Sequence, residues 1–485
     1  MIAVITIASI FLLAQLALLY AARRARLFVW AHATFYVTFV PVLHLLQYLS
    51  REDRPRFHLD AYALAHSTVF LYVVLFLLFA GMLMRFMPQD TTLIRSVIPI
   101  SYNTLTGIFI AWVGLKIYLG IKYGALAFHI LQGEIEGAAQ FRLEFYDVFL
   151  STYLTFLAVG ACVAFALKGV IARAWPNPLQ TGIFTMFLAI YLVLGEASIG
   201  ARRFVLLITL VTVTGAVRAW QVEPERLMRK LSILAVTGLL IAVMFSVYFQ
   251  MVRSNVIKSE ISFSIASGDL LEMAGGALAA LIPDIDPEIE TELPVMLRTG
   301  PFELIYDILA NQVETGATTR GRITTSSLEM IVPYVLAGPD KTSVNVDQIL
   351  VDELGIIPSD GFVYGAVNID LAGSLLAVFL ADYGLIGALI APIVTVVALL
   401  ICSLMLRWAG TNTLLAVFAL SALFQVVGNA EGDFLAVLAV IRDLFLGSMT
   451  IIGICTVTKF IGHIFRIDPK RTRLSSKHAQ EITNL

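Results

Sequence analysis

Long apolar runs separated by short polar segments dominate the chain. A helix needs about 20 mostly apolar residues to cross a bilayer, and the sequence contains about eleven runs of roughly that length. They lie at Met1–Ala21, Leu27–Leu49, Ala61–Met84, Val97–Gly120, Tyr146–Leu167, Leu179–Gly195, Phe204–Trp220, Leu231–Gln250, Leu385–Trp408, Leu414–Gly428 and Leu435–Phe460. The pattern therefore predicts an all-α polytopic integral membrane protein.

Basic residues in the short connections predict the orientation of these helices. Lys and Arg beside a span resist translocation, so cytoplasmic connections carry an excess of them. With the N-terminus outside and the C-terminus inside, the cytoplasmic connections receive residues such as Arg23, Arg85, Arg173, Arg229 and Arg407. The basic end of the chain is then a cytoplasmic tail, which we expect to lie against anionic headgroups.

This topology divides the chain into four parts. Residues 1–250 hold transmembrane helices one to eight, 251–370 form one large extracytoplasmic loop, 371–460 hold an interface helix and helices nine to eleven, and 461–485 form the tail. A loop as long as the one at residues 251–370 is usually functional.

Two segments do not fit a single straight span. The apolar run Leu371–Trp408 is too long for one helix, so we expect Leu371–Ala381 to lie in the outer interface and to turn at Asp382-Tyr383-Gly384 into the ninth span. In the last span, the adjacent charges Arg442 and Asp443 should face a polar cavity or each other, because an unpaired charge is costly inside a bilayer.

Composition narrows the possible functions. The chain is 59% hydrophobic and 14% charged, with a net charge of −2, whereas soluble domains average about 25% charged residues. These values exclude a water-soluble enzyme, a disordered chain and nucleic-acid binding driven by net charge. Cys162, Cys402 and Cys455 lie inside apolar runs and no metal-ligand spacing is present, so we expect neither a disulfide framework nor a metal or other cofactor.

Basic residues on the predicted outer face are the first candidate site. Arg202 and Arg203 stand where the seventh span begins, and the helix dipole disfavours cations there, which suggests an anionic partner. Snorkelling to lipid headgroups is the alternative. Arg142, Arg253, Arg320, Arg322 and Lys341 are further outer cations, each of which could also be a solvated loop charge. Guanidinium groups bind phosphate through planar, bidentate contacts, so several converging arginines would hold a diphosphate without a metal.

Candidate general bases are harder to choose. His129, Glu431 and Asp433 are outer histidine and carboxylate groups that could remove a proton, as could Asp360, Asp370 and Asp382. Each of them could equally be a solvated loop residue.

Three short motifs resemble those of bacterial oligosaccharide repeat-unit polymerases, the O-antigen (Wzy-type) polymerases. They are Ile331-Val-Pro-Tyr-Val-Leu-Ala-Gly-Pro-Asp-Lys341, Ala381-Asp-Tyr-Gly-Leu-Ile-Gly387 and Ile199-Gly-Ala-Arg202. Tyr334 stands where that family often has arginine, and Ala201 replaces its serine. Only Arg202 and Lys341 therefore carry over by motif, while Arg203, Arg253, Arg320 and Arg322 rest on charge and topology.

The resemblance implies a glycosyltransferase with a multi-helix fold of the lipid-linked-sugar (glycosyltransferase C-like) type in the bacterial cytoplasmic (inner) membrane. Its donor and acceptor would be oligosaccharides on undecaprenyl diphosphate, joined on the outer, periplasmic face. Arg202 and Lys341 would then be catalytic by motif, and Arg322 by its charge and expected outer position. Arg203, Arg253, Arg320 and Arg142, which rest on charge and topology as well, would bind the diphosphate. Membrane lipids, a chain-length regulator and a flippase are the expected partners, and nucleic acid is not.

Two other functions remain open. An O-antigen ligase would share the donor but transfer the glycan to a lipid A core. A non-enzymatic lipid-glycan flippase or transporter would carry ionisable residues at mid-depth in its spans, whereas the central portions here are nearly free of Asp, Glu, Lys and Arg.

Overall fold

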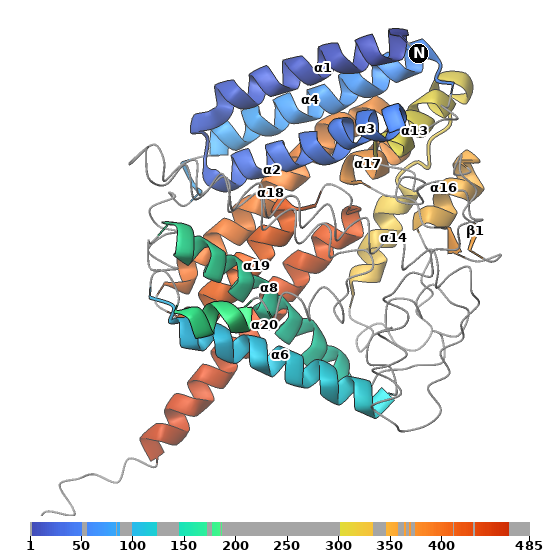
Figure 1. Cartoon of the computed structure of the whole chain (residues 1–485). Helices are drawn as coiled ribbons and strands as arrows, with labels where there is room; N and C mark the ends of the chain where they lie inside the picture. The colour runs from blue at the N-terminus through green and yellow to red at the C-terminus, as the bar shows by residue number, and fades with distance from the viewer. Residues whose placement is uncertain are drawn as a thin grey trace, which may run out of the picture.

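The computed structural model describes a helical bundle (Figure 1). It covers residues 2–50, 56–83, 85–87, 99–123, 145–171, 177–184, 186, 301–332, 346–356, 363–364, 368–369, 374–410, 412–429 and 432–464. The first helices are α1 (Ile2–Ala21), η1 (Ala22–Arg24), α2 (Leu27–Val37), the π-helical turn η2 (Thr38–Val42), α3 (Leu43–Ser50), α4 (Leu59–Leu83), α6 (Tyr102–Tyr123) and α8 (Phe145–Ile171).

The second half of the described chain is also almost entirely helical. It contains α13 (Pro301–Thr315), α14 (Arg322–Ile331), α16 (Val346–Leu354), α17 (Leu375–Tyr383), η6 (Gly384–Ile386), α18 (Gly387–Ala409), α19 (Thr413–Val427) and α20 (Phe434–Ile464). The strands β1 (Val363–Tyr364) and β2 (Asn368–Ile369) pair antiparallel, with Val363 opposite Ile369.

Five helical stretches are long and apolar enough to cross a membrane, which confirms an α-helical membrane protein. They are Ile2–Ala21, Leu27–Leu46, Leu59–Leu83, Leu375–Ala409 and Phe434–Val457, and the apolar helices Phe149–Phe165 and Thr413–Val427 are shorter. The predicted spans at Leu179–Gly195, Phe204–Trp220 and Leu231–Gln250 lie largely or wholly outside the described residues. The number eleven therefore stays a prediction.

The second predicted span is interrupted by a π-helical turn. Pro41 lies inside η2, between α2 and α3. Proline has no N–H to donate and its ring clashes with the carbonyl four residues earlier, so the backbone widens at this point. The span nevertheless continues to Ser50.

The connection between α17 and α18 contains the predicted turn, and the helix before it is buried by its neighbours. α17 ends at Tyr383, and α18 begins at Gly387 after η6. Every residue from Leu375 to Asp382 is buried, which fits a helix that is apolar on all sides. Its expected place in the outer membrane interface stays a prediction.

Close backbone contacts hold the helices together. A Cβ atom on Gly387 would lie 2.0 Å from the carbonyl oxygen of Phe379, so only glycine lets α18 start directly against α17. In the same way, a Cβ atom on Gly160 of α8 would lie 2.0 Å from the carbonyl oxygen of Val417 in α19. These glycines set the distance between neighbouring helices.

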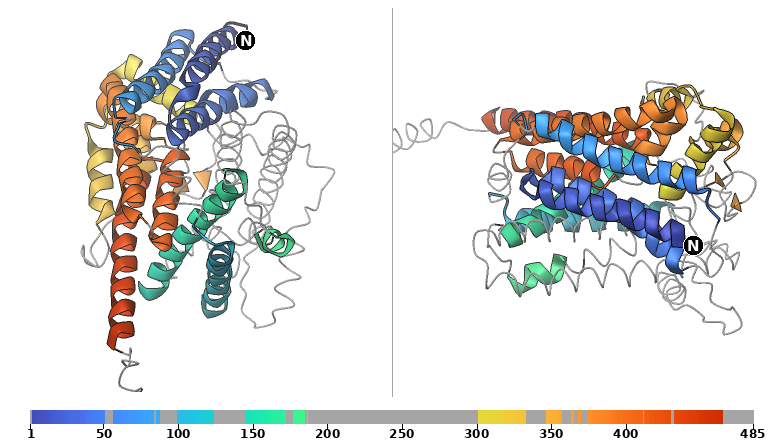
Figure 2. Two further views of the ribbon diagram at one scale, coloured as in Figure 1. Left: turned by 90° about the vertical axis from the view of Figure 1, so that its left-hand side faces the viewer. Right: turned by 90° about the horizontal axis from the view of Figure 1, so that it is seen from above.

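The helices of the candidate site gather at one end of the bundle. The view from above in Figure 2 shows α13, α14 and α16 toward the same end of the bundle as the start of α1, with the end of α20 at the opposite end. α18 begins beside α17 and carries Arg407 in its last turn, and 23 helical residues rise about 34 Å. Arg407 is thus separated from α14 by the length of a membrane span.

Candidate functional site

The turn between α13 and α14 carries two of the predicted cations, Arg320 and Arg322. The N–H of Arg322 donates to the carbonyl of Thr319 at 3.0 Å, which closes a tight turn over residues 319–322. Both central residues have positive φ, 50° at Arg320 and 84° at Gly321. Glycine tolerates this conformation, but it is uncommon for arginine and costs backbone free energy.

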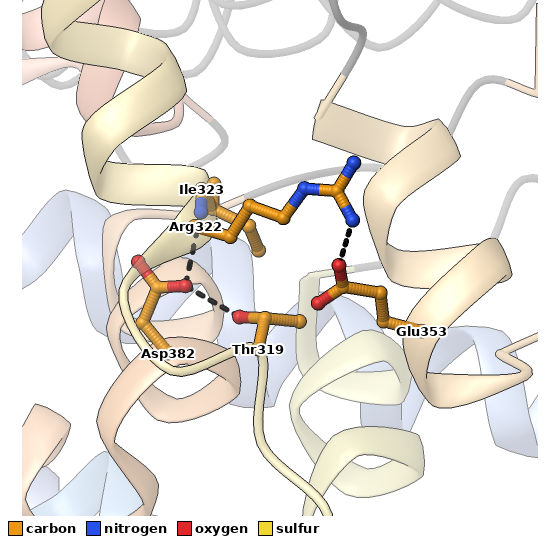
Figure 3. A network of polar contacts seen from close by, with 5 residues as sticks. All are labelled: Thr319, Arg322, Ile323, Glu353 and Asp382. Atoms are coloured by element: carbon orange, nitrogen blue, oxygen red, sulfur yellow. Dashed lines mark hydrogen bonds and ion pairs between the residues drawn. The ribbon is translucent and has the colours of Figure 1, made fainter.

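Asp382 holds this turn from below (Figure 3). One carboxylate oxygen accepts from the N–H of Ile323 at 3.1 Å and from the hydroxyl of Thr319. The other accepts from the N–H of Thr324 at 2.7 Å and from the hydroxyl of the same residue. Asp382 is only 2% exposed, and its contacts with Thr319 and Ile323 are buried.

These contacts make Asp382 a cap for α14 that comes from another helix. The residue before α14 is Gly321, which has no side chain to accept the first N–H groups of the helix. A carboxylate at a helix N-terminus is also favoured by the helix dipole. Asp382, one of the outer carboxylates considered as a base, therefore anchors the arginine-bearing turn.

Neighbouring residues of the same motif complete the attachment. The N–H of Thr319 donates to the carbonyl of Ala381 at 2.9 Å, and the amide of Gln312 donates to the carbonyl of Leu380 at 2.7 Å. A Cβ atom on Gly321 would lie 3.2 Å from the hydroxyl oxygen of Tyr383. The end of α17 thus fixes both sides of the turn.

The two arginine side chains face outward. Arg320 is exposed, and the Arg322 side chain is 59% exposed and forms an ion pair with Glu353 on α16 (Figure 3). Asn311 of α13 donates to the carbonyl of Leu354 at 2.6 Å, which holds α16 beside the turn. Two exposed guanidinium groups on one fixed turn can bind an oxyanion through several donors.

The remaining predicted site residues fall into two groups. Asp433 accepts from the N–H of Ala436 at 2.8 Å and therefore caps α20. The others lie outside the described residues, namely Arg142, Arg202, Arg203, Arg253, Lys341, His129, Asp360, Asp370 and Glu431. The structure thus brings Arg320 and Arg322 together and leaves their relation to Arg202 and Lys341 as a prediction.

Sequence reasoning missed the partners of these arginines. Glu353 and the two threonines, Thr319 and Thr324, were not singled out, and the link to Asp382 joins positions 58 to 63 residues apart. The only local signals were the Thr-Thr-Arg-Gly-Arg turn sequence and the Asp-Tyr-Gly motif. Nothing in either indicates that they touch.

The charged pair predicted in the last span is also present. Arg442 Nε donates to Asp443 Oδ1 at 2.8 Å, as expected for charges that face each other. Arg442 also donates to the carbonyl of Ile331, the last residue of α14, at 3.4 Å. Both ends of α14 are therefore tied to helices of the bundle.

Within the part of the chain that the structure describes, no group of three or more His, Cys, Asp or Glu side chains is placed to hold a metal ion. No protein-family model, curated protein or solved structure matches the chain.

Proposed function

We propose that the chain polymerises oligosaccharide repeat units carried on undecaprenyl diphosphate, as a glycosyltransferase on the outer face of the bacterial cytoplasmic membrane. The observation that carries the proposal is the turn of Arg320 and Arg322, strained at Arg320 and held by the buried carboxylate of Asp382. Strained backbone that the surrounding structure enforces is found preferentially at functional sites.

Such a turn suits the chemistry of glycosyl transfer. When the glycosidic bond to the lipid breaks, negative charge develops on the leaving diphosphate, and fixed guanidinium donors stabilise that charge. Arg322 and Arg320 would contact the diphosphate directly, while Asp382 is a positioning residue. Arg202 and Lys341 are proposed to complete the cationic site, with His129 or Glu431 as the candidate base.

The test is chain extension by the purified protein with defined lipid-linked repeat units in detergent. A polymerase makes long glycans under these conditions, a ligase needs a lipid A core acceptor, and a flippase makes no product. Arg322→Ala should slow extension by roughly ten- to hundredfold, because one charge-assisted hydrogen bond is worth about 1.5–3 kcal/mol. Arg322→Lys should recover only part of the rate, since lysine loses the planar two-donor fork.

Arg407→Ala is the matched control, because Arg407 is an exposed arginine in the last turn of α18, far from the turn. It should extend glycans at the parent rate. Absence of any polymer from the parent protein, with both lipid-linked substrates supplied, would exclude the proposal.

A lipid-glycan flippase or transporter is the second candidate, favoured by histidines buried in the spans. His32, His44 and His66 are all at most 1% exposed, and ionisable groups inside a membrane often mark transport pathways. His32 has a structural use, since its ring nitrogens contact the carbonyl of Val427 at 2.9 Å and the hydroxyl of Tyr72 at 3.0 Å. A transporter would move labelled lipid-linked repeat units across vesicles in the absence of an acceptor.

A further inference from the structure

A row of exposed apolar side chains runs along η6 and α18, starting beside the turn of Arg320 and Arg322, the arginine turn. Its members recur at helical spacing, so they lie along one face of the helix. Each is at least 42% exposed, whereas the buried face of α18 packs against α4 and α19. We call this row the α18 ridge, and it consists of Leu385, Leu389, Ile393, Val397, Leu404 and Trp408.

The composition and length of this segment make the ridge a lipid-facing surface. Residues Gly384–Leu406 include no Asp, Glu, Lys or Arg, and Leu375–Ala409 is one of the stretches apolar enough to cross a membrane. As a helix, the stretch from Leu385 to Trp408 rises about 35 Å, enough to cross the hydrocarbon core of a bilayer. The ridge therefore faces lipid along its length.

The first residue of the ridge lies beside the arginine turn. A Cβ atom on Gly384, the residue before Leu385, would lie 4.0 Å from Cγ2 of Thr318. Thr318 is in turn only two residues before Arg320. Exposed cations and an exposed apolar ridge therefore adjoin at the start of α18.

Tyr383 lies at this junction. It is 37% exposed, and its hydroxyl oxygen lies against Gly321 of the arginine turn. Tyrosine is enriched where lipid meets water, because its ring is apolar and its hydroxyl group is polar. In the predicted topology, the arginine turn is thus at the level of the outer headgroups.

A cationic turn that adjoins an apolar ridge matches an amphipathic ligand with an anionic head. Guanidinium groups bind such a head through charge-assisted hydrogen bonds, while an apolar chain can stay in lipid and avoid water. The ridge segment contributes no carboxylate that would repel the head. Glu353, which pairs with Arg322, belongs to α16.

We propose that the α18 ridge holds the isoprenoid chain of the lipid-linked donor while the arginine turn holds its diphosphate. This inference rests on the proposed function, which supplies a ligand with these two parts. The donor enters sideways from the bilayer, with its chain along α18 and its head at the turn. A soluble diphosphate contacts only the cationic part of this site.

Photolabelling of the purified full chain in lipid nanodiscs tests the ridge. Two probes carry the same isoprenoid chain with a diazirine, one ending in a diphosphate and the other in an alcohol, and mass spectrometry identifies the labelled residues. The alcohol reports contact with bulk lipid. It should label the ridge and the exposed positions Ile10 and Leu13 of α1 alike, since these are 60% and 67% exposed.

The diphosphate probe should favour the ridge. Relative to the alcohol probe, its labelling of the ridge over α1 should be roughly tenfold higher, the effect of one charge-assisted hydrogen bond at the head. Arg322→Ala should abolish most of this preference. Arg407→Ala is the matched control, because it removes an exposed arginine at the other end of α18 and should keep the preference.

Three results would overturn the proposal. Equal ratios of ridge to α1 labelling for the two probes in the parent protein would show that bulk lipid covers the ridge, and this result depends on no variant. Absence of ridge labelling by either probe would show that a protein, such as a second copy of the chain, covers it. An unchanged preference in Arg322→Ala would show that the turn does not hold the head.

The outcome is separable from that of the proposed function. Chain extension by a protein whose ridge shows no preference for the diphosphate probe would overturn the ridge site and leave the polymerase. A clear preference without any polymer would support the ridge site and exclude polymerisation.

Discussion

Replacing Asp382 by asparagine is the sharpest test of how the arginine turn is held. Asparagine keeps one acceptor oxygen but replaces the other by an NH2 group, which donates hydrogen bonds and cannot accept them. The NH2 group would then face either the donors Ile323 N–H and Thr319 hydroxyl or the donors of Thr324. In either orientation one backbone N–H loses its acceptor, whereas the threonine hydroxyl beside it can rotate and accept from the NH2 group; the negative charge is lost as well.

The size of the effect follows from these contacts. A hydrogen bond to a charged group contributes about 1.5–3 kcal/mol, so losing one should cost about that much in local stability. At the lower value, opening of the turn becomes more frequent by roughly tenfold. Deuterium exchange of peptides covering residues 316–331, measured by mass spectrometry in detergent, should rise by at least that factor.

Affinity for inorganic pyrophosphate, measured by calorimetry, should fall in parallel, because Arg320 and Arg322 would no longer be held in position. Asp352→Asn makes the same charge change at an exposed site on α16 and should affect neither measurement. If Asp382→Asn exchanges within threefold of the parent, the carboxylate does not hold the turn. If exchange rises but pyrophosphate binding is retained, the fixed turn is not what binds the anion.

Three further outcomes are expected. Glu353→Gln should increase the affinity for inorganic pyrophosphate by about two- to fivefold, because an exposed ion pair of about 0.2–1 kcal/mol no longer competes for Arg322. Asp352→Asn should leave this affinity unchanged, and an unchanged affinity in both variants would show that the ion pair does not affect binding. Gly160→Ala should lower the melting temperature through its clash with α19, whereas Gly114→Ala on α6, where a Cβ meets nothing within 4 Å, should not. A cysteine replacing Leu328, which is 49% exposed, should react with a membrane-impermeant maleimide in intact cells, and labelling only after lysis would reverse the predicted orientation.

The helices themselves could be predicted from the sequence because their signal is local. Apolar runs of span length and the Asp382-Tyr383-Gly384 turn are visible in the order of residues alone, and both are present in the structure. The pairing of Arg442 with Asp443 was also predictable, since the two are adjacent and a charge in a span must be compensated.

The location of α17 could not be inferred in the same way. The run Leu371–Trp408 is too long for one span, so its length predicted a break. The length did not predict where the helix before the break lies. By composition alone, an apolar helix is about equally compatible with lipid, the membrane interface or a protein interior. Its environment is determined by the helices that pack against it. Here α13 and α14 cover it, and both come from the segment predicted as a large outer loop.

Buried histidines show a similar limit. The sequence places His32, His44 and His66 inside apolar runs, where each could face lipid, a pathway or a neighbouring helix. Their partners lie far along the chain, 395 residues away for the carbonyl of Val427 and more than 200 for Glu303. The role of each buried histidine therefore depends on tertiary packing.

The same dependence decides what an outer carboxylate can do. A general base needs a lone pair that is free to accept the substrate's proton and a path by which the substrate reaches it. Asp382 offers neither, since its two oxygens already accept four donors and it is almost fully buried. Its negative charge instead stabilises the start of α14 and a strained turn beneath two exposed cations. If Asp382 serves the reaction by fixing the arginines, activity should fall when an acceptor oxygen is removed. If it were a base, activity should also depend on pH through its protonation, and this difference separates the two roles.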